Sequence, residues 1–106
     1  MNIYHSTKVL PYVYLCTHKE TGEFYYGSRC ANRTPSNVDL PLYRTSSRRV
    51  NPIFTEFNYF IIAEFFDKDS AYDFEQQLIH ENWNNPLILN DSCFHNCKRF
   101  RASNAN

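Results

Sequence analysis

The sequence predicts a small α/β (α+β) domain in which a mainly antiparallel three-stranded sheet is flanked by helices. Three observations lead to this fold class: two neighbouring runs of strand-forming aromatic residues, a longer apolar run in the second half, and a helical segment that follows it. The 106 residues are enough for one compact domain and too few for two of ordinary size. Hydrophobic residues make up 42% of the chain, which is ample material for one core.

The first two predicted strands form a hairpin. Residues 12–17 are strand-forming types, and residues 24–28 resume the pattern after a polar segment that contains Gly22. Because side chains alternate along a strand, Tyr14 and Tyr25 can share one face of the sheet. The chain has only two glycines, so each is expected to mark a backbone position that a side chain would obstruct.

Residues 29–52 are predicted to form a basic surface loop with short helical turns. Three prolines and many polar residues argue against a long helix or strand in this segment. A short helix is expected over residues 51–57. The apolar run at residues 59–66 has the length of a strand, and we predict that it is the central buried strand.

A longer helix is predicted to start where Asp69 or Ser70 can cap it, with Ser70 and Asp73 as an approximate capping box, and to end near Trp83. Helical periodicity puts five apolar residues on one broad face: Ala71, Phe74, Leu78, Ile79 and Trp83. The opposite face carries Asp73, Gln76, Gln77, His80 and Glu81. Glu75 falls inside the apolar face.

The position of Glu75 is unusual because burial of an unpaired carboxylate is costly. A divalent cation, an arginine partner or a place at the rim of the core would offset this cost. From the helix alone, structural pairing is favoured over metal ligation, although a carboxylate that holds Mg²⁺ is common at phosphoryl-transfer sites.

The distribution of charged and apolar residues bears on which partners and which cell compartment are expected. The net charge is zero, so no overall field attracts the chain to DNA or membranes, but residues 29–49 carry five arginines against Asp39 alone. No apolar run has the roughly 18 to 20 residues needed to cross a bilayer, and the amino terminus lacks a signal-peptide core. We expect a soluble cytoplasmic protein, in the host cytoplasm if phage-encoded, with reduced cysteines.

Two aromatic tripeptides at residues 12–14 and 25–27, on adjacent predicted strands, resemble the two motifs of the GIY-YIG nuclease domain family. That family also has a glutamate on a later helix and an asparagine near the end of the domain, where Glu75 and Asn90 stand. Residues 43–47 are similar to the Tyr-x-x-Ser-Ser segment of its phage or homing-endonuclease-like branch. The resemblance covers residues 11–90, and the order and spacing of the four elements together carry it.

The resemblance implies a role for individual residues. Tyr14 and Tyr25 match the motif tyrosines, and Gly27 matches the second motif's glycine, whereas Tyr12 and Tyr26 replace the family's usual glycine and isoleucine. Glu75 matches the metal-binding acid. Arg29 is the first choice for the family arginine, with Arg44 and Arg48 as alternatives.

The implied function is a metal-dependent endonuclease that hydrolyses DNA phosphodiester bonds. Tyr14 or Tyr25 would activate a water, Arg29 would stabilise the transition state, and Glu75 would hold one Mg²⁺ or Mn²⁺. A phenol with its ordinary pKa of about 10 is a poor base, so a nearby positive charge or a second phenol must stabilise the phenolate.

The expected partner is DNA, most naturally double-stranded, with no membrane and no small-molecule cofactor. Further candidates for nucleic-acid contacts are Arg33, Tyr43, Arg44, Ser46, Ser47, Arg48, Arg49 and Asn90. Sequence recognition would need a partner or an appended domain, because the family usually gains specificity that way.

Simpler interpretations remain open. The tyrosines are also explained as half-buried strand residues, the arginines as a solvated face, and Ser46 with Ser47 as a turn. The scaffold also suits a nucleic-acid-binding module without cleavage, or a phage-type protein-interaction or inhibitor protein.

The predicted organisation is an amino-terminal extension (1–10), a nuclease-like domain (11–90) and a basic tail (91–106). In the tail, Cys93, His95 and Cys97 raise the alternative of a zinc site, which would need a fourth ligand such as Cys30. Lys98, Arg99 and Arg101 either touch phosphate or keep the terminus solvated.

Overall fold

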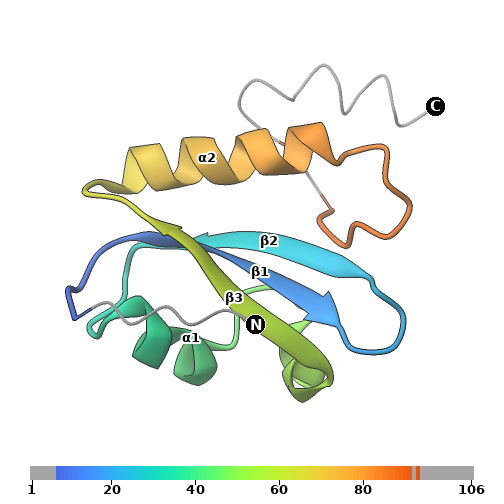
Figure 1. Ribbon diagram of the computed structural model, residues 1–106, viewed down its shortest axis with the longest axis horizontal. Coiled ribbons are helices and arrows are strands. Elements are labelled where there is room, and N and C mark those ends of the chain that lie inside the picture. Colours follow the sequence, from blue (N-terminus) through green and yellow to red (C-terminus); the bar gives the residue numbers. More distant parts are fainter. Residues whose placement is uncertain (1–6, 92, 94–106) are drawn as a thin grey trace.

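A computed structural model describes residues 7–91 and 93 of the chain. Three antiparallel strands form one sheet in the order β2–β1–β3 (Figure 1). In chain order, the elements are β1 (Tyr12–His18), β2 (Phe24–Arg29), α1 (Ser36–Tyr43), the 3₁₀ helix η1 (Asn51–Glu56), β3 (Phe57–Glu64) and α2 (Lys68–Glu81). The predicted α+β class and its three-stranded sheet are confirmed.

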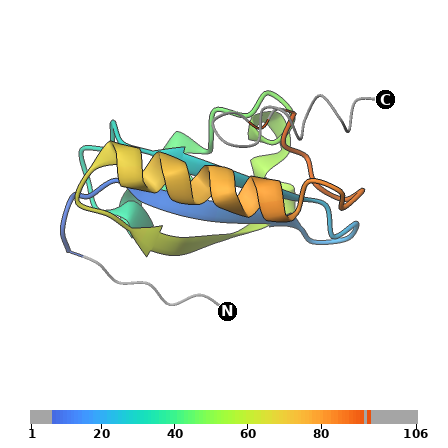
Figure 2. The same ribbon diagram turned by 90° about the horizontal axis from the view of Figure 1, so that it is seen from above.

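The sheet separates two helical layers. Helix α2 lies along one face, and α1 and η1 lie against the other (Figures 1 and 2). A core cluster built around Tyr12, Tyr14 and Leu40 fills the α1 side, and a smaller cluster of Ile79, Trp83 and Cys93 lies on the α2 side. The α1 and η1 layer is therefore anchored mainly on β1 and β3, and the α2 layer on β2 and β1.

The predicted hairpin is present. Tyr14 pairs with Gly27, and Cys16 pairs with Tyr25, so the tyrosines of the two motifs lie on the same face, towards α1. At the hairpin tip, Gly22 has a left-handed φ of 78°, which L side chains rarely adopt. The two glycines are needed for different reasons. Gly22 adopts a backbone conformation that favours glycine, whereas Gly27 leaves room for the neighbouring Tyr14 side chain.

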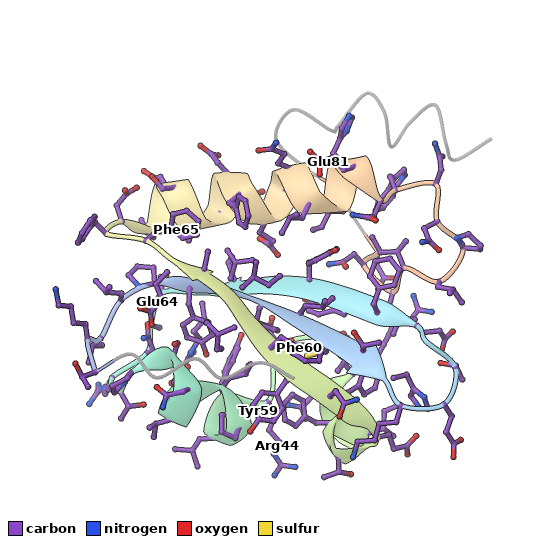
Figure 3. All side chains as sticks on the ribbon, viewed as in Figure 1. Arg44, Tyr59, Phe60, Glu64, Phe65 and Glu81 are labelled. Atoms are coloured by element: carbon purple, nitrogen blue, oxygen red, sulfur yellow. The ribbon has the colours of Figure 1, made fainter. Side chains whose placement is uncertain are left out.

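The prediction that residues 59–66 form the central strand is wrong. Strand β1 is central, and β3 is an edge strand that spans Phe57–Glu64. Tyr59 and Phe60 lie on opposite faces of β3 (Figure 3), and Tyr59 stays half-exposed while its ring stacks on Phe54. Aromatic residues that cover the sheet from an edge produce the same continuous apolar run as a buried strand.

The segment at residues 29–52 is more structured and more buried than a surface loop. It contains the two-turn helix α1, which starts directly after Pro35 and carries Pro41 in its last turn, where the missing N–H leaves the Asn37 carbonyl without its helical hydrogen bond. Ser36, Leu40 and Val50 are fully buried in this segment. Its prolines therefore limit the length of the helix without keeping the segment at the surface.

Helix α2 has the predicted position but a different amino-terminal cap. The cap is Asp67, whose carboxylate accepts a hydrogen bond from the Ser70 backbone N–H at 2.9 Å, and not Asp69 or Ser70. The helix ends at Glu81, two residues before the predicted Trp83. Gln76, expected on the polar face, is buried, because the helix turns the line of Ala71, Glu75 and Ile79 towards the sheet.

Some expectations concern residues outside the described part of the chain. Most of the basic tail and two of the possible zinc ligands, His95 and Cys97, lie there, as do residues 1–6 of the extension. Cys16, Cys30 and Cys93 carry free thiols. Among residues 7–91 and 93, no helix has the length and apolar character needed to cross a membrane.

Candidate active site around the edge strand

The phenols of Tyr14 and Tyr25 lie side by side on the α1 face of the hairpin. Their ring centroids are 6.3 Å apart. Tyr14 is only 1% exposed, and its hydroxyl donates a hydrogen bond to Thr45 Oγ1 at 2.5 Å. Burial, reinforced by Tyr25, raises the pKa of Tyr14 well above its ordinary value. Tyr25 is half-buried, and burial followed by the charge of Glu75 raises its pKa to about 12.

Glu75 lies on the sheet-facing side of α2, as the helical pattern predicts. The residue is 9% exposed, and its Oε1 accepts a hydrogen bond from the Ser28 hydroxyl at 3.0 Å. Burial raises the pKa of the carboxyl group, while hydrogen bonds from Ser28 and Gln76 act in the opposite direction. None of the ion pairs among residues 7–91 and 93 involves Glu75.

Tyr25 and Glu75 approach each other from the two sides of strand β2. The register puts Ser28 on the α2 face of the sheet and Tyr25 on the α1 face, yet the charge of Glu75 still raises the pKa of Tyr25. Because β2 is an edge strand, groups from both faces can interact around it. The sequence predicts that the tyrosines and Glu75 meet at one exposed concave surface, and this prediction is wrong. They form a largely buried cluster around the edge strand, with the tyrosines on the α1 face and Glu75 on the α2 side.

Gly27 makes room for the Tyr14 phenol. The two residues are direct partners in the sheet, and a Cβ atom at Gly27 would overlap the end of the Tyr14 ring and its hydroxyl oxygen. The close approach of the tyrosine to the β2 backbone thus depends on the absence of a side chain. This is the obstruction expected from the sequence.

Arg29, the last residue of β2, belongs to a hydrogen-bonded network with Asp39 on the α1 face of the sheet. Its Nε donates to Asp39 Oδ2 at 3.0 Å, and its Nη2 lies 3.5 Å from Asp39 Oδ1. The guanidinium carbon lies 3.8 Å from the centre of the Tyr43 ring, which is a cation–π contact. The Tyr12 hydroxyl donates to the same carboxylate at 2.5 Å. Asp39 and Tyr43 therefore fix the orientation of this arginine.

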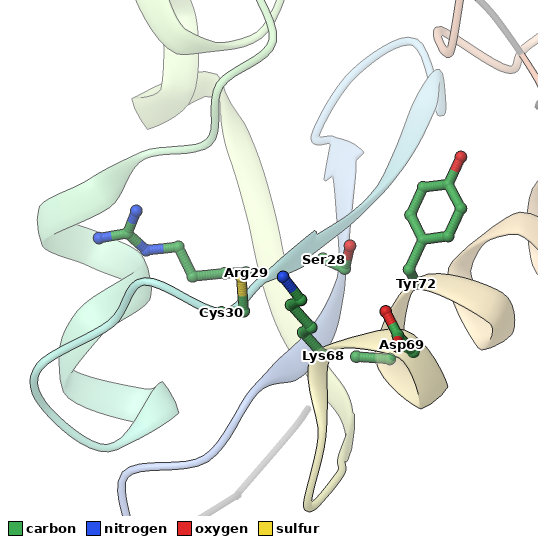
Figure 4. Close-up of a pocket in the computed structure, with 7 residues that line it drawn as sticks. Ser28, Arg29, Cys30, Lys68, Asp69 and Tyr72 are labelled. Carbon is green, nitrogen blue, oxygen red and sulfur yellow. The ribbon is translucent and has the colours of Figure 1, made fainter.

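A pocket of about 230 Å³ opens between the end of β2 and the start of α2. Ser28, Arg29, Lys68 and Tyr72 are among the residues that line it (Figure 4). The Arg29 side chain extends towards α1, away from Lys68 and Tyr72 (Figure 4). Since Ser28 also bonds Glu75, the pocket adjoins the buried carboxylate.

The candidate nucleic-acid contacts divide into free and occupied groups. Arg33, Arg44 and Arg48 are exposed, and so is Ser46, although hydrogen bonding by Ser46 also acts to lower the pKa of Tyr25. Arg49 donates to Asp91 at 2.7 Å and to the Leu89 carbonyl at 3.4 Å. The Ser47 hydroxyl accepts the backbone N–H groups of residues 49 and 50. Arg33, Arg44 and Arg48 thus remain the arginines of this set that are best placed to meet phosphate.

Asn90 is joined to strand β2 by its side chain. Its Oδ1 accepts the Tyr26 backbone N–H at 3.0 Å, and its Nδ2 donates to the Tyr26 carbonyl at 2.8 Å. The amide extends the pairing that Leu87 and Leu89 make with the Phe24 backbone. In this arrangement, Asn90 completes the pairing of the edge strand, and its amide is not presented to a ligand.

We expect Asn90→Ala to lower the free energy of unfolding by about 2 kcal/mol, because two partly buried backbone groups of Tyr26 lose their partner. Asn90→Asp keeps the acceptor and loses the donor, so its effect should be intermediate. Urea unfolding measures both effects. Asn84→Ala, at an exposed position, is the matched control and should change little. An Asn90→Ala protein as stable as the control would contradict this structural role.

The donor set for a metal is a single carboxylate. Among the described residues, no group of three or more His, Cys, Asp or Glu side chains could enclose a metal ion. Mg²⁺ is commonly bound through one or two carboxylates, with waters and substrate phosphates as the other ligands. Glu75 fits that binding mode and does not fit a closed all-protein site.

Comparison of the chain with family models, with curated proteins and with solved structures gives no match. The resemblance to GIY-YIG domains therefore depends on the sequence motifs alone.

Four residues of the site were not predicted from the sequence: Ser28, Asp39, Thr45 and Asn51. The alternation of side chains along a strand could have indicated Ser28, because Ser28 and Tyr26 lie on the same face of β2, the face that α2 covers. Asp39 was visible as the single acid among the arginines. Nothing in the sequence pattern indicated Thr45, which has a left-handed φ of 67°, or Asn51, whose Nδ2 donates to the Thr45 carbonyl at 3.1 Å.

Proposed function

We propose that this chain is a metal-dependent endonuclease that hydrolyses DNA phosphodiester bonds through a GIY-YIG-type site. The observation that carries the proposal is Glu75, a carboxylate that is largely buried, close enough to Tyr25 to raise its pKa, and outside every ion pair among residues 7–91 and 93. Pairing with an arginine was the simpler explanation for its burial. A bound cation would offset the part of this cost that the hydrogen bonds from Ser28 and Gln76 leave.

The two tyrosines have different roles in this proposal. Tyr25 is only half-buried, so we assign it to water activation, whereas the nearly inaccessible Tyr14 donates to Thr45 and supports Tyr25. The water would give its proton to the Tyr25 phenolate oxygen. Mg²⁺ or Mn²⁺ held by Glu75 would supply positive charge to the scissile phosphate and the departing oxygen. Compensation of the Glu75 charge would also ease the ionisation of Tyr25.

Arg29 supplies fixed positive charge in the same scheme. Its Nε and Nη2 interact with Asp39, and Nη1 takes part in neither contact. A phosphate oxygen could therefore be bound through Nη1 without breaking the pair with Asp39. A preorientated donor stabilises developing negative charge without having to reorganise during the reaction.

The test is cleavage of supercoiled plasmid in Mg²⁺ or Mn²⁺ by the wild type, by Glu75→Gln and by Glu81→Gln. We expect cutting by the wild type and a loss on the order of 100-fold for Glu75→Gln. Glu81 lies on the exposed side of the same helix, so Glu81→Gln should cut normally. Equal cutting by all three proteins would remove Glu75 from the site.

Unfolding of the same variants at different pH values separates catalysis from folding. The folded-state pKa of Glu75 is raised, so its ionisation opposes folding above that pKa, and the penalty disappears below the ordinary value of 4.5. At pH 7, Glu75→Gln should be at least as stable as the wild type. This advantage should fade as the pH falls towards 4.5. A Glu75→Gln protein that is less stable at pH 7 would indicate a structural role for the carboxylate.

A nucleic-acid-binding module without cleavage is the second candidate. It is favoured by the fact that the Tyr14 hydroxyl and the Arg29 guanidinium already have protein partners. Retention of a DNA duplex by the wild type, without cutting in either metal, would favour this function over the nuclease. Substitution of Arg44 and Arg48 should then weaken retention and reduce its dependence on salt.

A further inference from the structure

The turn after α1 contains two consecutive residues in a left-handed conformation. Arg44 has a φ of 58° and Thr45 has a φ of 67°. For a β-branched residue such as threonine this region is a genuine outlier, because the Cβ substituents crowd the backbone. Such conformations persist only where surrounding contacts enforce them, and they concentrate at functional sites.

Asn51 supplies the contacts that hold this turn. Its Nδ2 donates to the Arg44 carbonyl at 3.0 Å and to the Thr45 carbonyl at 3.1 Å. The Asn51 backbone N–H donates to the Ser47 carbonyl at 2.9 Å, which fixes the amide relative to the turn. One side chain therefore binds the carbonyls of both strained residues.

The result of this conformation is that the Thr45 hydroxyl points into the tyrosine pair. Thr45 is only 2% exposed, and its Oγ1 accepts the Tyr14 hydroxyl at 2.5 Å and the Ser47 backbone N–H at 3.3 Å. Hydrogen bonding by Thr45 also acts to lower the pKa of Tyr14 and that of Tyr25, against the effect of burial. Thr45 thus acts on both phenols.

We propose that Thr45 is a positioning residue that holds the phenols of Tyr14 and Tyr25 as a pair, and that Asn51 keeps the left-handed turn that delivers its hydroxyl. A hydroxyl can accept one hydrogen bond while donating another. It accepts from neutral Tyr14, and it can donate to the Tyr25 oxygen when Tyr25 loses its proton. The catalytic meaning of this pairing rests on the proposed nuclease function, whereas the pairing itself does not.

The pairing is tested by NMR on the full chain, through exchange of the Tyr14 hydroxyl proton with water. We expect a slowly exchanging resonance in the wild type and in Thr45→Ser. Exchange should be faster by about tenfold or more in Thr45→Val, which has the same shape without the hydroxyl, and in Asn51→Ala. Thr55→Val, at an exposed threonine, and Asn84→Ala are the matched controls and should exchange as the wild type does.

Either of two results would overturn the proposal. One is a Thr45→Val protein whose Tyr14 hydroxyl exchanges at the wild-type rate, and the other is faster exchange in Thr45→Ser equal to that in Thr45→Val. If Thr45→Val does not fold, Asn51→Ala decides in its place, since it leaves the hydroxyl present and removes only the support of the turn. Wild-type exchange in Asn51→Ala would then reject the role of the turn.

The cleavage assay adds a second, distinguishable result. If the wild type cuts plasmid, Thr45→Val should reach half of its maximal rate at higher pH than the wild type, and Thr45→Ser should restore the wild-type profile. An unchanged profile in an active Thr45→Val protein would reject the effect of Thr45 on the reacting phenol. If the wild type does not cut, the nuclease proposal fails, and the exchange measurement still decides the pairing.

Discussion

Replacing Gly27 with alanine is expected to lower the free energy of unfolding by about 3 kcal/mol, at the upper end of the usual cost of overpacking. The added Cβ would overlap the end of the Tyr14 ring. That ring cannot easily move away, because Tyr14 is buried and its hydroxyl is held by Thr45. Chemical unfolding monitored by circular dichroism measures the loss.

Gly22→Ala is the matched control for this effect. Gly22 has a left-handed φ, but its nearest neighbour on the Cβ side is 4.0 Å away, so only backbone strain of about 1 kcal/mol is expected. Tyr14→Leu should rescue Gly27→Ala selectively, with a coupling energy of about 2 kcal/mol, because the shorter side chain frees the space. If the effects of Gly27→Ala and Tyr14→Leu on stability simply add, the close approach of the Tyr14 ring is not the reason why a glycine stands at position 27.

Local patterns predicted much of this fold. The alternation in the hairpin, its turn and the amphipathic helix placed β1, β2 and α2 within a few residues, because these signals depend on near neighbours in the sequence. The same patterns put Tyr14 and Tyr25 on one face and Glu75 towards the sheet. These arrangements follow from periodicity alone.

Other features were not predictable because they depend on tertiary context. An apolar run does not tell whether a strand lies at the centre or at the edge, and β3 was placed wrongly for that reason. The burial of Gln76 depends on how α2 is rotated against the sheet. The left-handed Thr45 has no signature at all, since its conformation is maintained by Asn51 from six residues away.

Asp39→Ala should lower the free energy of unfolding by about 3 kcal/mol, because it removes the common partner of two groups. The Tyr12 hydroxyl, on a fully buried residue, would lose its acceptor, and the Arg29 guanidinium would lose its counter-charge. Arg29 is partly exposed, so water can solvate its guanidinium when the carboxylate is removed. The expected loss of stability is therefore at the low end of the range for breaking a buried ion pair. Thermal or urea unfolding gives the value.

Tyr12→Phe separates the two contributions. It removes only the hydroxyl and should cost about 1 kcal/mol, the usual value for one hydrogen bond. In the Tyr12→Phe background, Asp39→Ala should cost less than in the wild type, since no phenol is left unsatisfied. Costs that simply add would mean that the Tyr12 hydroxyl and Asp39 are not coupled.

Asp39→Asn distinguishes the electrostatic part of the network from its shape. The amide oxygen can still accept from Tyr12, but it carries no charge to hold Arg29. We therefore expect a smaller loss of stability than in Asp39→Ala, together with a guanidinium that leaves its place over the Tyr43 ring. If Arg29 acts on the scissile phosphate, plasmid cleavage should fall further in Asp39→Asn than stability does, because orientation rather than folding is lost. Full cleavage by a folded Asp39→Asn protein would instead point to Arg44 or Arg48 as the catalytic arginine.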